Sequence, residues 1–318
     1  MQVKYKEREI NLPDFLIVGA ARSGTTFLVY LLQQHPRIFF PAVKEPMFFS
    51  LYEQEKVIID VRTGRKVDYA VENLDNYLQL FKGAKKGQLI GEASTWYLYF
   101  YEATLANIAK VYGQAMDRLK VIILLRNPVE RAWSHYWLKR RNGEESLSFD
   151  QAISARVVAE RREKNYTPGF DYLEYGKYFL RVKAYLDSEA KTKVIIYEDL
   201  LKDKEKLMKE LFLFLGVEPV SLTKYQQVRV NVAGRPKNRL SAFLGQLVYQ
   251  PHALKSSMKA LIPYHWRARW KNRLASSLFI KESIPEEWRL KLVEFYRDDV
   301  HQLGALLNRD LTFWLEER

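Results

Sequence analysis

The chain has 318 residues, enough to bury one substantial hydrophobic core or two modest ones. It carries 51 Lys and Arg residues against 38 Asp and Glu, and the net charge of +13 favours anionic partners: a nucleotide, an acidic glycan, nucleic acid or a lipid surface. The absence of cysteine excludes disulfides, structural thiolate zinc and thiol catalysis within this sequence.

The first twelve residues are charged and contain no apolar core of a secretory signal. No apolar stretch in the sequence approaches the length that spans a bilayer. We therefore expect a soluble, cytoplasmic protein without a transmembrane segment. The net charge remains compatible with peripheral contact to a membrane surface.

The segment 14–26 is the first strong motif of the chain. Apolar residues over 15–18 predict a buried strand, and the apolar periodicity over 27–32 predicts a helix. The turn between them contains Gly19 and Gly24. Such a turn binds anions because unpaired backbone N–H groups and the positive end of the helix dipole point at the ligand.

The cation of this turn distinguishes it from a nucleoside-triphosphate P-loop. The glycine spacing is that of a P-loop, but Thr25 stands where such a loop has the Lys that reaches the β- and γ-phosphates. The cation lies inside the turn, at Arg22. The pattern predicts a phosphate-bearing ligand that needs no obligatory metal. The residues expected to bind it are Arg22, Ser23, Gly24, Thr25 and Thr26.

Strands and helices are predicted to alternate through the rest of the chain. This order indicates an α/β fold with a P-loop-like parallel sheet, helices on both faces and a ligand site beyond the carboxyl ends of the strands. We expect a single domain over 1–318, in which 230–318 form a basic, mainly helical C-terminal extension packed on the core. The predicted strands are 38–40, 89–94, 119–125 and 193–197, with a weaker edge-strand pattern over 57–61, and the predicted helices are 74–81, 97–112, 128–141, 149–164, 178–186, 203–215 and 286–307.

The aliphatic run 119–125 is typical of a central parallel strand. Asn127 follows it as a good N-cap and Pro128 as a good first helical residue. Where a P-loop NTPase has an Asp that supports Mg²⁺, this strand ends in Arg126. Arg126 and Ser134, two helical turns beyond, are therefore expected to hold a second phosphate by bidentate charge and by a hydroxyl.

Taken together, these motifs resemble the sulfotransferases that use 3′-phosphoadenosine 5′-phosphosulfate (PAPS), in particular the carbohydrate (heparan-type) and related bacterial branch. Two departures are Arg22, where many members have Lys, and Thr95, where the branch often has Pro after Ser94. The segments that carry the resemblance are Gly19-Ala20-Ala21-Arg22-Ser23-Gly24-Thr25-Thr26, Lys44-Glu45-Pro46, Arg126-Asn127-Pro128-Val129-Glu130-Arg131-Ala132-Trp133-Ser134-His135-Tyr136, and the C-terminal stretch 296–314.

The resemblance implies in-line transfer of a sulfuryl group from PAPS to an acceptor hydroxyl, with 3′-phosphoadenosine 5′-phosphate (PAP) as product and no required metal. By resemblance Glu45 is the base that takes the acceptor proton, a role that suits a carboxylate whose pKa lies near the working pH. Lys44 or Arg22 would stabilise charge on the sulfonate and on the leaving nucleotide. The alternative for Glu45 is a simple ion pair with Lys44. His35 and His135 are weaker candidates for the base.

The resemblance also implies a late loop that closes over the 3′-phosphate and the acceptor. The basic loop 231–239 matches it, with Arg235 and Lys237 as candidate lid cations. A solvated basic turn explains this loop equally well. The expected acceptor is a carbohydrate or glycosylated molecule, an acidic glycan being one class, chosen by loops 50–70 and 142–175. Glu92 and Ser94 could line its site, although an N-cap role for Ser94 fits as well.

Two other function classes stay open from the sequence alone. A P-loop kinase or NTPase with a degenerate loop is disfavoured by Thr25 and Arg126. A non-catalytic protein that binds nucleic acid or membrane is suggested by residues 255–273, which interleave aromatic and basic residues. The leading interpretation remains a sulfotransferase, whose partners are the donor nucleotide and a hydroxyl acceptor and not nucleic acid.

Overall fold

The computed structural model describes residues 1–55, 57–221, 235–237, 241, 278–280 and 282–316. Its centre is a five-stranded parallel sheet in the order β4-β5-β3-β6-β7. The sequence prediction of a parallel α/β fold is confirmed. The five strands are β3 (Phe15–Gly19), β4 (Ile38–Phe39), β5 (Leu89–Ala93), β6 (Lys120–Leu125) and β7 (Lys191–Ile196).

The strand order places a switch point beside the first motif. After β3 the chain adds β4 and β5 on one side of it, and then β6 and β7 on the other. Because ligands of open α/β sheets bind outside the carboxyl ends of the strands at such a reversal, the loops after β3 and β6 share one crevice.

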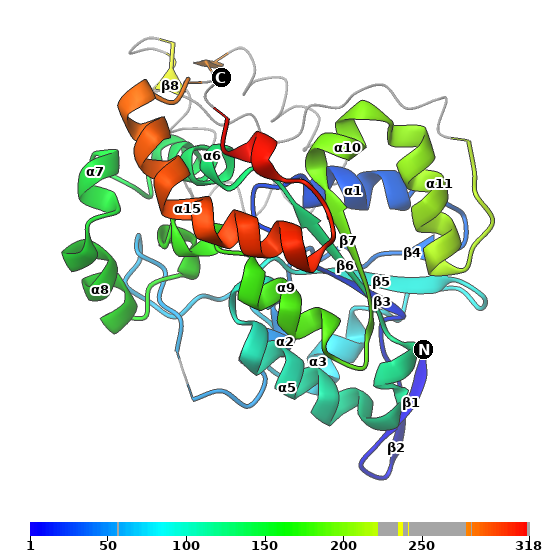
Figure 1. The fold of residues 1–318 in the computed structure, drawn as a ribbon. Coiled ribbons are helices and arrows are strands. Elements are labelled where there is room, and N and C mark those ends of the chain that lie inside the picture. Colours follow the sequence, from blue (N-terminus) through cyan, green and yellow to red (C-terminus); the bar gives the residue numbers. More distant parts are fainter. Residues whose placement is uncertain (56, 222–234, 238–240, 242–277, 281, 317–318) are drawn as a thin grey trace.

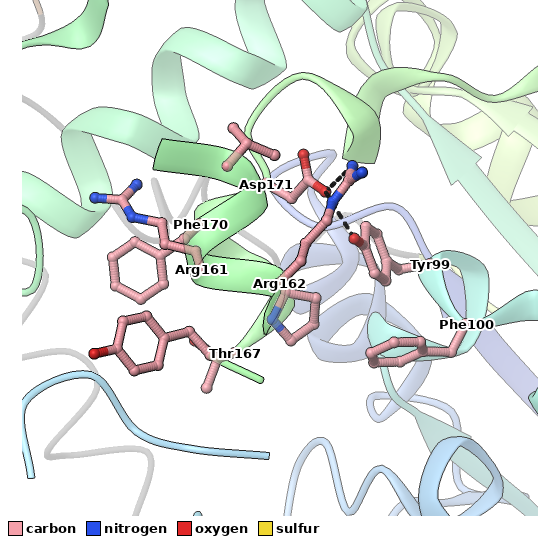
Figure 2. A pocket seen from close by; sticks show the side chains of 10 residues that line it. Tyr99, Phe100, Arg161, Arg162, Thr167, Phe170 and Asp171 are labelled. Atoms are coloured by element: carbon pink, nitrogen blue, oxygen red, sulfur yellow. Dashed lines mark hydrogen bonds and ion pairs between the residues drawn. The ribbon is translucent and has the colours of Figure 1, made fainter. Parts of the chain in front are cut away.

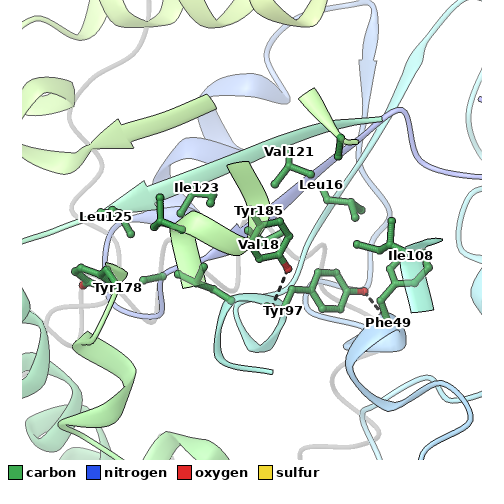
Figure 3. Packing of buried hydrophobic residues seen from close by; sticks show 14 of the residues in the cluster. Leu16, Val18, Phe49, Tyr97, Ile108, Val121, Ile123, Leu125, Tyr178 and Tyr185 are labelled. Atoms are coloured by element: carbon green, nitrogen blue, oxygen red, sulfur yellow. Dashed lines mark hydrogen bonds between the residues drawn. The ribbon is translucent and has the colours of Figure 1, made fainter. Parts of the chain in front are cut away.

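Apolar residues alternate between the two faces of the central strands. Phe15 and Ile17 of β3 pack with α1 (Thr25–Leu32) and α11 (Lys204–Leu215). Leu16 and Val18 face the other side, which α5 (Tyr101–Tyr112) and α9 (Phe179–Leu186) cover. Figure 1 shows these helix layers, and Figure 3 shows the tyrosines that pack beneath β3 and β6. Burial on both faces explains why these strands are continuous apolar runs.

The remaining elements are short, except for two helices. The longer ones are α6 (Pro128–Arg141) and α15 (Glu286–Leu306). None of the helices in the described ranges is long and apolar enough to cross a membrane. The short elements are β1 (Gln2–Tyr5), β2 (Arg8–Asn11), α2 (Phe48–Leu51), α3 (Leu74–Gln79), α4 (Trp96–Tyr99), η1 (Gly113–Arg118), α7 (Phe149–Ala152), α8 (Ala155–Glu163), η2 (Pro168–Phe170), η3 (Glu174–Gly176), α10 (Tyr197–Lys202), β8 (Arg235–Pro236), β9 (Phe279–Ile280) and η4 (Thr312–Trp314).

Three predictions of secondary structure were wrong. The helix predicted over 97–112 is divided into α4 and α5 by Phe100, whose ψ of 44° is not helical. The helix predicted over 149–164 is divided into α7 and α8, because Ser154 begins a second helix with an extended backbone. The pattern over 57–61 forms isolated bridges at Ile59 and no strand.

The C-terminal extension is described only in part. Helix α15 confirms the helix predicted from residue 286. The stretches 222–234, 238–240 and 242–277 lie outside the described residues, and with them most of the predicted lid loop and all of the aromatic and basic segment 255–273.

Candidate functional site

Two glycines shape the loop between β3 and α1. Gly24 precedes α1 with φ 95°, a left-handed conformation that side chains rarely adopt. A Cβ there would lie 2.7 Å from the Tyr197 ring, and a Cβ on Gly19 would lie 2.7 Å from Cβ of Leu98. The close packing therefore requires glycine at both positions, as the P-loop spacing indicated.

Arg22 points from this loop to helix α6. Its Nε and Nη2 donate to Oγ of Ser134 at 3.2 and 2.9 Å. The Arg22 backbone is left-handed, with φ 70°, which turns the side chain across the crevice. Two predicted phosphate-binding residues, far apart in sequence, thus lie in direct contact.

Arg126 lies beside them at the end of β6. Its Nη1 donates to the Arg22 carbonyl oxygen at 3.4 Å, and its guanidinium lies 5.6 Å from the centroid of the Tyr197 ring. Its Nη2 pairs with Glu130 at 3.5 Å, and Glu130 also accepts from Arg289 at 3.1 Å. These contacts orient Arg126 while leaving it at the carboxyl edge of the sheet.

Helix α6 begins as predicted. Oδ1 of Asn127 accepts hydrogen bonds from the N–H groups of Val129 and Glu130 at 2.9 and 3.3 Å, and Pro128 occupies the first turn. Nδ2 of Asn127 donates to the Trp314 carbonyl oxygen at 3.0 Å, which ties the C-terminal stretch to the site. The cap fixes the direction of the helix that carries Ser134.

The electrostatics of the crevice favour an anion. Burial lowers the pKa of Arg22 to about 9, with the guanidinium groups of Arg141, Arg126 and Arg131 acting in the same direction. Guanidinium groups remain protonated at neutral pH, so their clustering costs free energy that a bound anion would offset. A ligand with several negative charges fits this group of residues.

The other predicted loop residues lie around the start of α1. The Ser23 side chain is fully buried, and its N–H donates to the Ala20 carbonyl oxygen at 3.2 Å. Thr25 is buried and Thr26 is half-buried in the first turn of α1. Because N–H groups of a first helical turn have no intrahelical partner, the turn offers backbone donors to an anion.

Glu45 lies in the loop between β4 and α2. Nζ of Lys44 donates to its Oε1, and Oγ1 of Thr95 donates to its Oε2 at 3.3 Å. The side chains of Lys44 and Glu45 are 23% and 29% exposed, so solvent reaches both. The ion pair with Lys44, which was the alternative expectation for Glu45, is present. An ion pair does not exclude a role of the Glu45 carboxylate as a base.

The Glu45 loop and the glycine loop adjoin. Ala21 of the glycine loop and Met47 of the Glu45 loop belong to one buried apolar cluster, together with Trp96 and Tyr175. The loop that carries Lys44 and Glu45 therefore packs beside the loop that carries Arg22.

Glu92 and Ser94 do not line a surface, contrary to one expectation. Both side chains are fully buried, so an acceptor cannot touch them. The alternative role for Ser94, as a helix cap, is also wrong, because Thr95 is the residue that precedes α4 and the Ser94 hydroxyl accepts from the Met47 N–H instead. They form a polar network behind the Glu45 loop.

Both histidines have structural contacts. Nε2 of His35 lies 2.9 Å from the Glu218 carbonyl oxygen, and its Nδ1 accepts from the Arg37 N–H at 3.1 Å. His135 is buried, and burial with the nearby Arg131 holds its pKa well below the ordinary value. Neither histidine has the accessible setting of a general base.

The candidate lid cations lie in and beside a short strand. Strand β8 pairs with β9 and lies against α6, the helix that carries Ser134. Lys237 is exposed, and its N–H donates to the Leu278 carbonyl oxygen at 3.0 Å. Arg235 lies in β8, so the backbone of both residues runs close to α6.

The two loops expected to choose the acceptor meet. The Ile59 N–H donates to the Asn165 carbonyl oxygen at 2.8 Å, and the Thr167 N–H donates to the Ile59 carbonyl oxygen at 3.1 Å. A pocket lies where the second loop meets α4. Figure 2 shows Arg162 and Tyr99 both donating to Asp171 at its edge.

Tyr197 and Arg141 were not predicted from the sequence. Tyr197 directly follows β7 and lies against both Gly24 and Arg126. The sequence prediction placed Tyr197 inside the strand 193–197, whereas β7 ends at Ile196, so the position of Tyr197 beyond the strand end was not recognised. Arg141 is buried at the end of α6, and no local pattern links it to Arg22.

Comparisons with known proteins agree with this geometry. A family model described as the sulfotransferase domain matches residues 12–231. The membrane-associated sulfotransferase kil1 of Dictyostelium discoideum is 34% identical over 134 residues, which cover 41% of this chain and 24% of that protein. Human carbohydrate sulfotransferase 15 is 28% identical over 173 residues, which cover 45% of this chain and 30% of that protein. The matched regions thus span less than a third of these relatives' length.

A solved structure extends the similarity to nearly the whole chain. A sulfotransferase from Alicyclobacillus acidocaldarius superposes with a TM-score of 0.69 at 28% sequence identity, over 96% of this chain and 100% of that one. The family resemblance inferred from the glycine loop and the Arg126 motif is confirmed. With a family model over most of its length and a shared fold, this chain belongs to the sulfotransferase domain family.

Proposed function

We propose that this chain transfers a sulfuryl group from PAPS to a hydroxyl of an acceptor and releases PAP. The observation that carries the proposal is the contact between Arg22 and Ser134, beside Arg126. It joins two anion-binding elements in one crevice, as a nucleotide with a 5′-phosphosulfate and a 3′-phosphate requires.

The donor would bind across these elements. Gly24, Thr25 and Thr26 would hold the 5′-phosphosulfate through backbone N–H groups and hydroxyls at the start of α1, with Ser23 completing the turn. Arg126 and Ser134 would hold the 3′-phosphate. A hydroxyl can accept from Arg22 and still donate its proton to a phosphate oxygen, so the observed contact is compatible with this role. Arg235 and Lys237 would add charge from β8.

The transfer itself needs one base and stabilised charge. As the acceptor oxygen forms its bond to sulfur, the bond from sulfur to the nucleotide's bridging oxygen breaks, and Glu45 takes the acceptor proton. Glu45 then becomes neutral, which releases Lys44 from its ion pair. Lys44 and Arg22 would stabilise the charge on the bridging oxygen and the sulfonate.

A carbohydrate hydroxyl is the acceptor class that we favour. One relative is named a carbohydrate sulfotransferase. The joined acceptor loops present Tyr69, which is 45% exposed and lies 6.1 Å from Trp96 in edge-to-face geometry, and exposed aromatic rings suit sugar faces. Arg62 of these loops pairs with Asp60, whereas Arg65 and Arg156 are exposed. The latter two would be available to an acidic glycan.

The proposal is tested with PAPS labelled in the sulfuryl group. Purified protein is incubated with a panel of neutral and anionic glycans, and label in each glycan is counted. We expect transfer to at least one glycan by the wild type and loss of transfer by Glu45→Gln, which keeps PAP binding. Label transfer by Glu45→Gln at a near-normal rate would remove Glu45 from the mechanism, and no transfer by the wild type to any member would refute the proposal.

A further inference from the structure

Glu92 is a buried carboxylate with an unusual set of partners. It lies in β5 with its side chain fully buried. Its oxygens accept from the Tyr97 hydroxyl at 2.6 Å, the Ser94 hydroxyl at 2.7 Å and the Tyr77 hydroxyl at 3.2 Å. Burial raises the pKa of Glu92 to about 7, while the three donors act in the opposite direction. The site therefore balances ionised and neutral forms near neutral pH.

Two of the three donors also hold the chain that follows Glu45. The Ser94 hydroxyl accepts from the Met47 N–H at 3.0 Å. The Tyr97 hydroxyl accepts a long hydrogen bond from the Phe49 N–H at 3.4 Å, drawn in Figure 3. A hydroxyl that gives its single proton to a carboxylate can only accept elsewhere. An ionised Glu92 thus draws both hydroxyl protons towards itself and leaves oxygen lone pairs for the Met47 and Phe49 N–H groups.

The loop held in this way is strained. Glu45 and Met47 have φ values of 61° and 59°, a left-handed conformation that is uncommon outside glycine. Such a conformation persists only where the surroundings determine it. The contacts that do so include the Met47 bond to Ser94 and the Glu45 N–H bond to the Ala93 carbonyl oxygen at 3.0 Å, both from the end of β5, and the Val71 N–H bond to the Pro46 carbonyl oxygen at 2.8 Å.

We propose that Glu92 is a positioning residue for sulfuryl transfer: through the Ser94 hydroxyl it holds the Met47 amide, and with it the turn that presents Glu45 to the acceptor. The inference rests on the proposed function, because it gives the turn a catalytic purpose. Glu92 itself is buried and does not touch the acceptor.

The environment of Glu92 gives this role a pH dependence. The groups that face it are Tyr77 of α3, Tyr97 of α4, Tyr112 of α5, Tyr185 of α9 and, from the neighbouring loop, Glu45. Burial raises the pKa of the four tyrosines well above the ordinary value, so they remain neutral around Glu92. A protonated Glu92 carries an O–H group that needs an acceptor. The Ser94 or Tyr97 hydroxyl must then accept from Glu92 instead of donating to it, and the turn is held less firmly.

Three variants separate positioning from simple stability. Ser94→Ala removes the link to Met47. Tyr77→Phe is the matched control, because it removes a hydroxyl that donates to the same carboxylate and keeps the ring that packs on Phe48. Glu92→Gln keeps the shape of the side chain and removes its titration. Each variant is measured for kcat and KM with PAPS and the best glycan of the panel, for its thermal shift with PAP, and for amide hydrogen exchange of residues 44–51.

We expect Ser94→Ala to lower kcat by roughly 30-fold or more, with KM for PAPS and the PAP thermal shift unchanged and faster exchange over 44–51. Tyr77→Phe should keep kcat within about threefold even where its melting temperature falls. Glu92→Gln should have a lower kcat than the wild type above about pH 7, where the wild-type carboxylate is ionised, and the ratio between the two should narrow at lower pH.

The proposal is overturned if Ser94→Ala and Tyr77→Phe lower kcat equally, or if exchange over 44–51 is unchanged in Ser94→Ala. Should Ser94→Ala fail to fold, a kcat ratio of wild type to Glu92→Gln that narrows as the pH falls supports the proposal, and a ratio that is constant with pH overturns it. A wild type that transfers no sulfuryl group refutes the proposed function, whereas the exchange measurement still tests the positioning of the turn.

Discussion

Arg22 and Ser134 are 112 residues apart in sequence, yet the Arg22 guanidinium donates from both Nε and Nη2 to the Ser134 hydroxyl. The contact bridges the glycine loop after β3 and helix α6 after β6. Because each of these elements is expected to bind an anion on its own, their contact places two such elements side by side at the carboxyl edge of the sheet.

Loss of the Ser134 hydroxyl should weaken binding at the 3′-phosphate. We expect Ser134→Ala to reduce PAP affinity about tenfold, since a hydrogen bond to a charged group contributes about 1.5 kcal/mol. AMP, which lacks the 3′-phosphate, should bind with nearly unchanged affinity. Calorimetric titrations measure both constants, and the exposed Ser146→Ala is the control. An equal loss for AMP and PAP would place Ser134 outside the 3′-phosphate site.

Substitutions of Arg22 should separate charge from geometry. Arg22→Lys keeps the cation but not the planar fork that engages Ser134, so we expect PAP affinity within about fivefold of the wild type. Arg22→Met removes the charge and should lower kcat with PAPS by roughly 50-fold or more. Steady-state kinetics and PAP titrations of both variants check this. Similar kinetics for Arg22→Met and Arg22→Lys would show that the charge is dispensable.

Gly24 should be far less tolerant of a side chain than an exposed glycine of similar conformation. Gly24→Ala must keep φ near 95° and also push a methyl group against the Tyr197 ring. Gly87 has φ 86°, and nothing lies within 4 Å of a Cβ there, so Gly87→Ala is the control for backbone strain alone. We expect Gly24→Ala to lose ~2 kcal/mol more than Gly87→Ala in the free energy of unfolding. Equal losses in urea unfolding would show that the Tyr197 contact is unimportant.

The titration of Glu92 should appear in the pH dependence of stability. Its folded pKa of about 7 lies above the ordinary value of 4.5, so between these values the folded chain keeps a proton that the unfolded chain has released. The free energy of unfolding therefore falls as the pH rises through this window and levels off above it. Glu92→Gln removes this slope.

Urea unfolding of the wild type and Glu92→Gln at several pH values checks the sign. We expect the variant to gain up to ~3 kcal/mol relative to the wild type between about pH 4.5 and 7.5, since a tenfold change in a proton-binding constant corresponds to about 1.4 kcal/mol. A difference that is constant with pH would contradict the raised pKa. With a raised pKa of Glu92, the free energy of unfolding is greatest at low pH, whereas the positioning role needs the ionised form and hence a higher pH.

Local patterns predicted most of the fold. The Asn127 cap and the helix from Pro128 to Arg141 follow from short-range rules, and the structure confirms both. The hairpin of β1 and β2 was not predicted, although buried and exposed residues alternate over Gln2–Tyr5, because so short and polar a strand gives a weak signal.

The parts of the site that were missed depend on long-range packing. Glu92 takes its donors from α3 and α4, and no sequence spacing brings Tyr77 to it. The Tyr197 ring meets Gly24, and the charge of the buried Arg141 acts on Arg22, only once β7 and α6 are folded against the glycine loop. Residue type and spacing predict which side chains can bind an anion, whereas the supporting contacts require the tertiary fold.

The most direct test of the central claim compares nucleotides that differ in the 3′-phosphate. The protein is titrated with PAP, AMP and ATP, and the melting temperature is recorded for the wild type and Arg126→Ala. We predict that low micromolar PAP raises the melting temperature of the wild type, that AMP and ATP do so far less, and that Arg126→Ala removes the preference for PAP. Equal shifts for the three nucleotides in the wild type would contradict the claim.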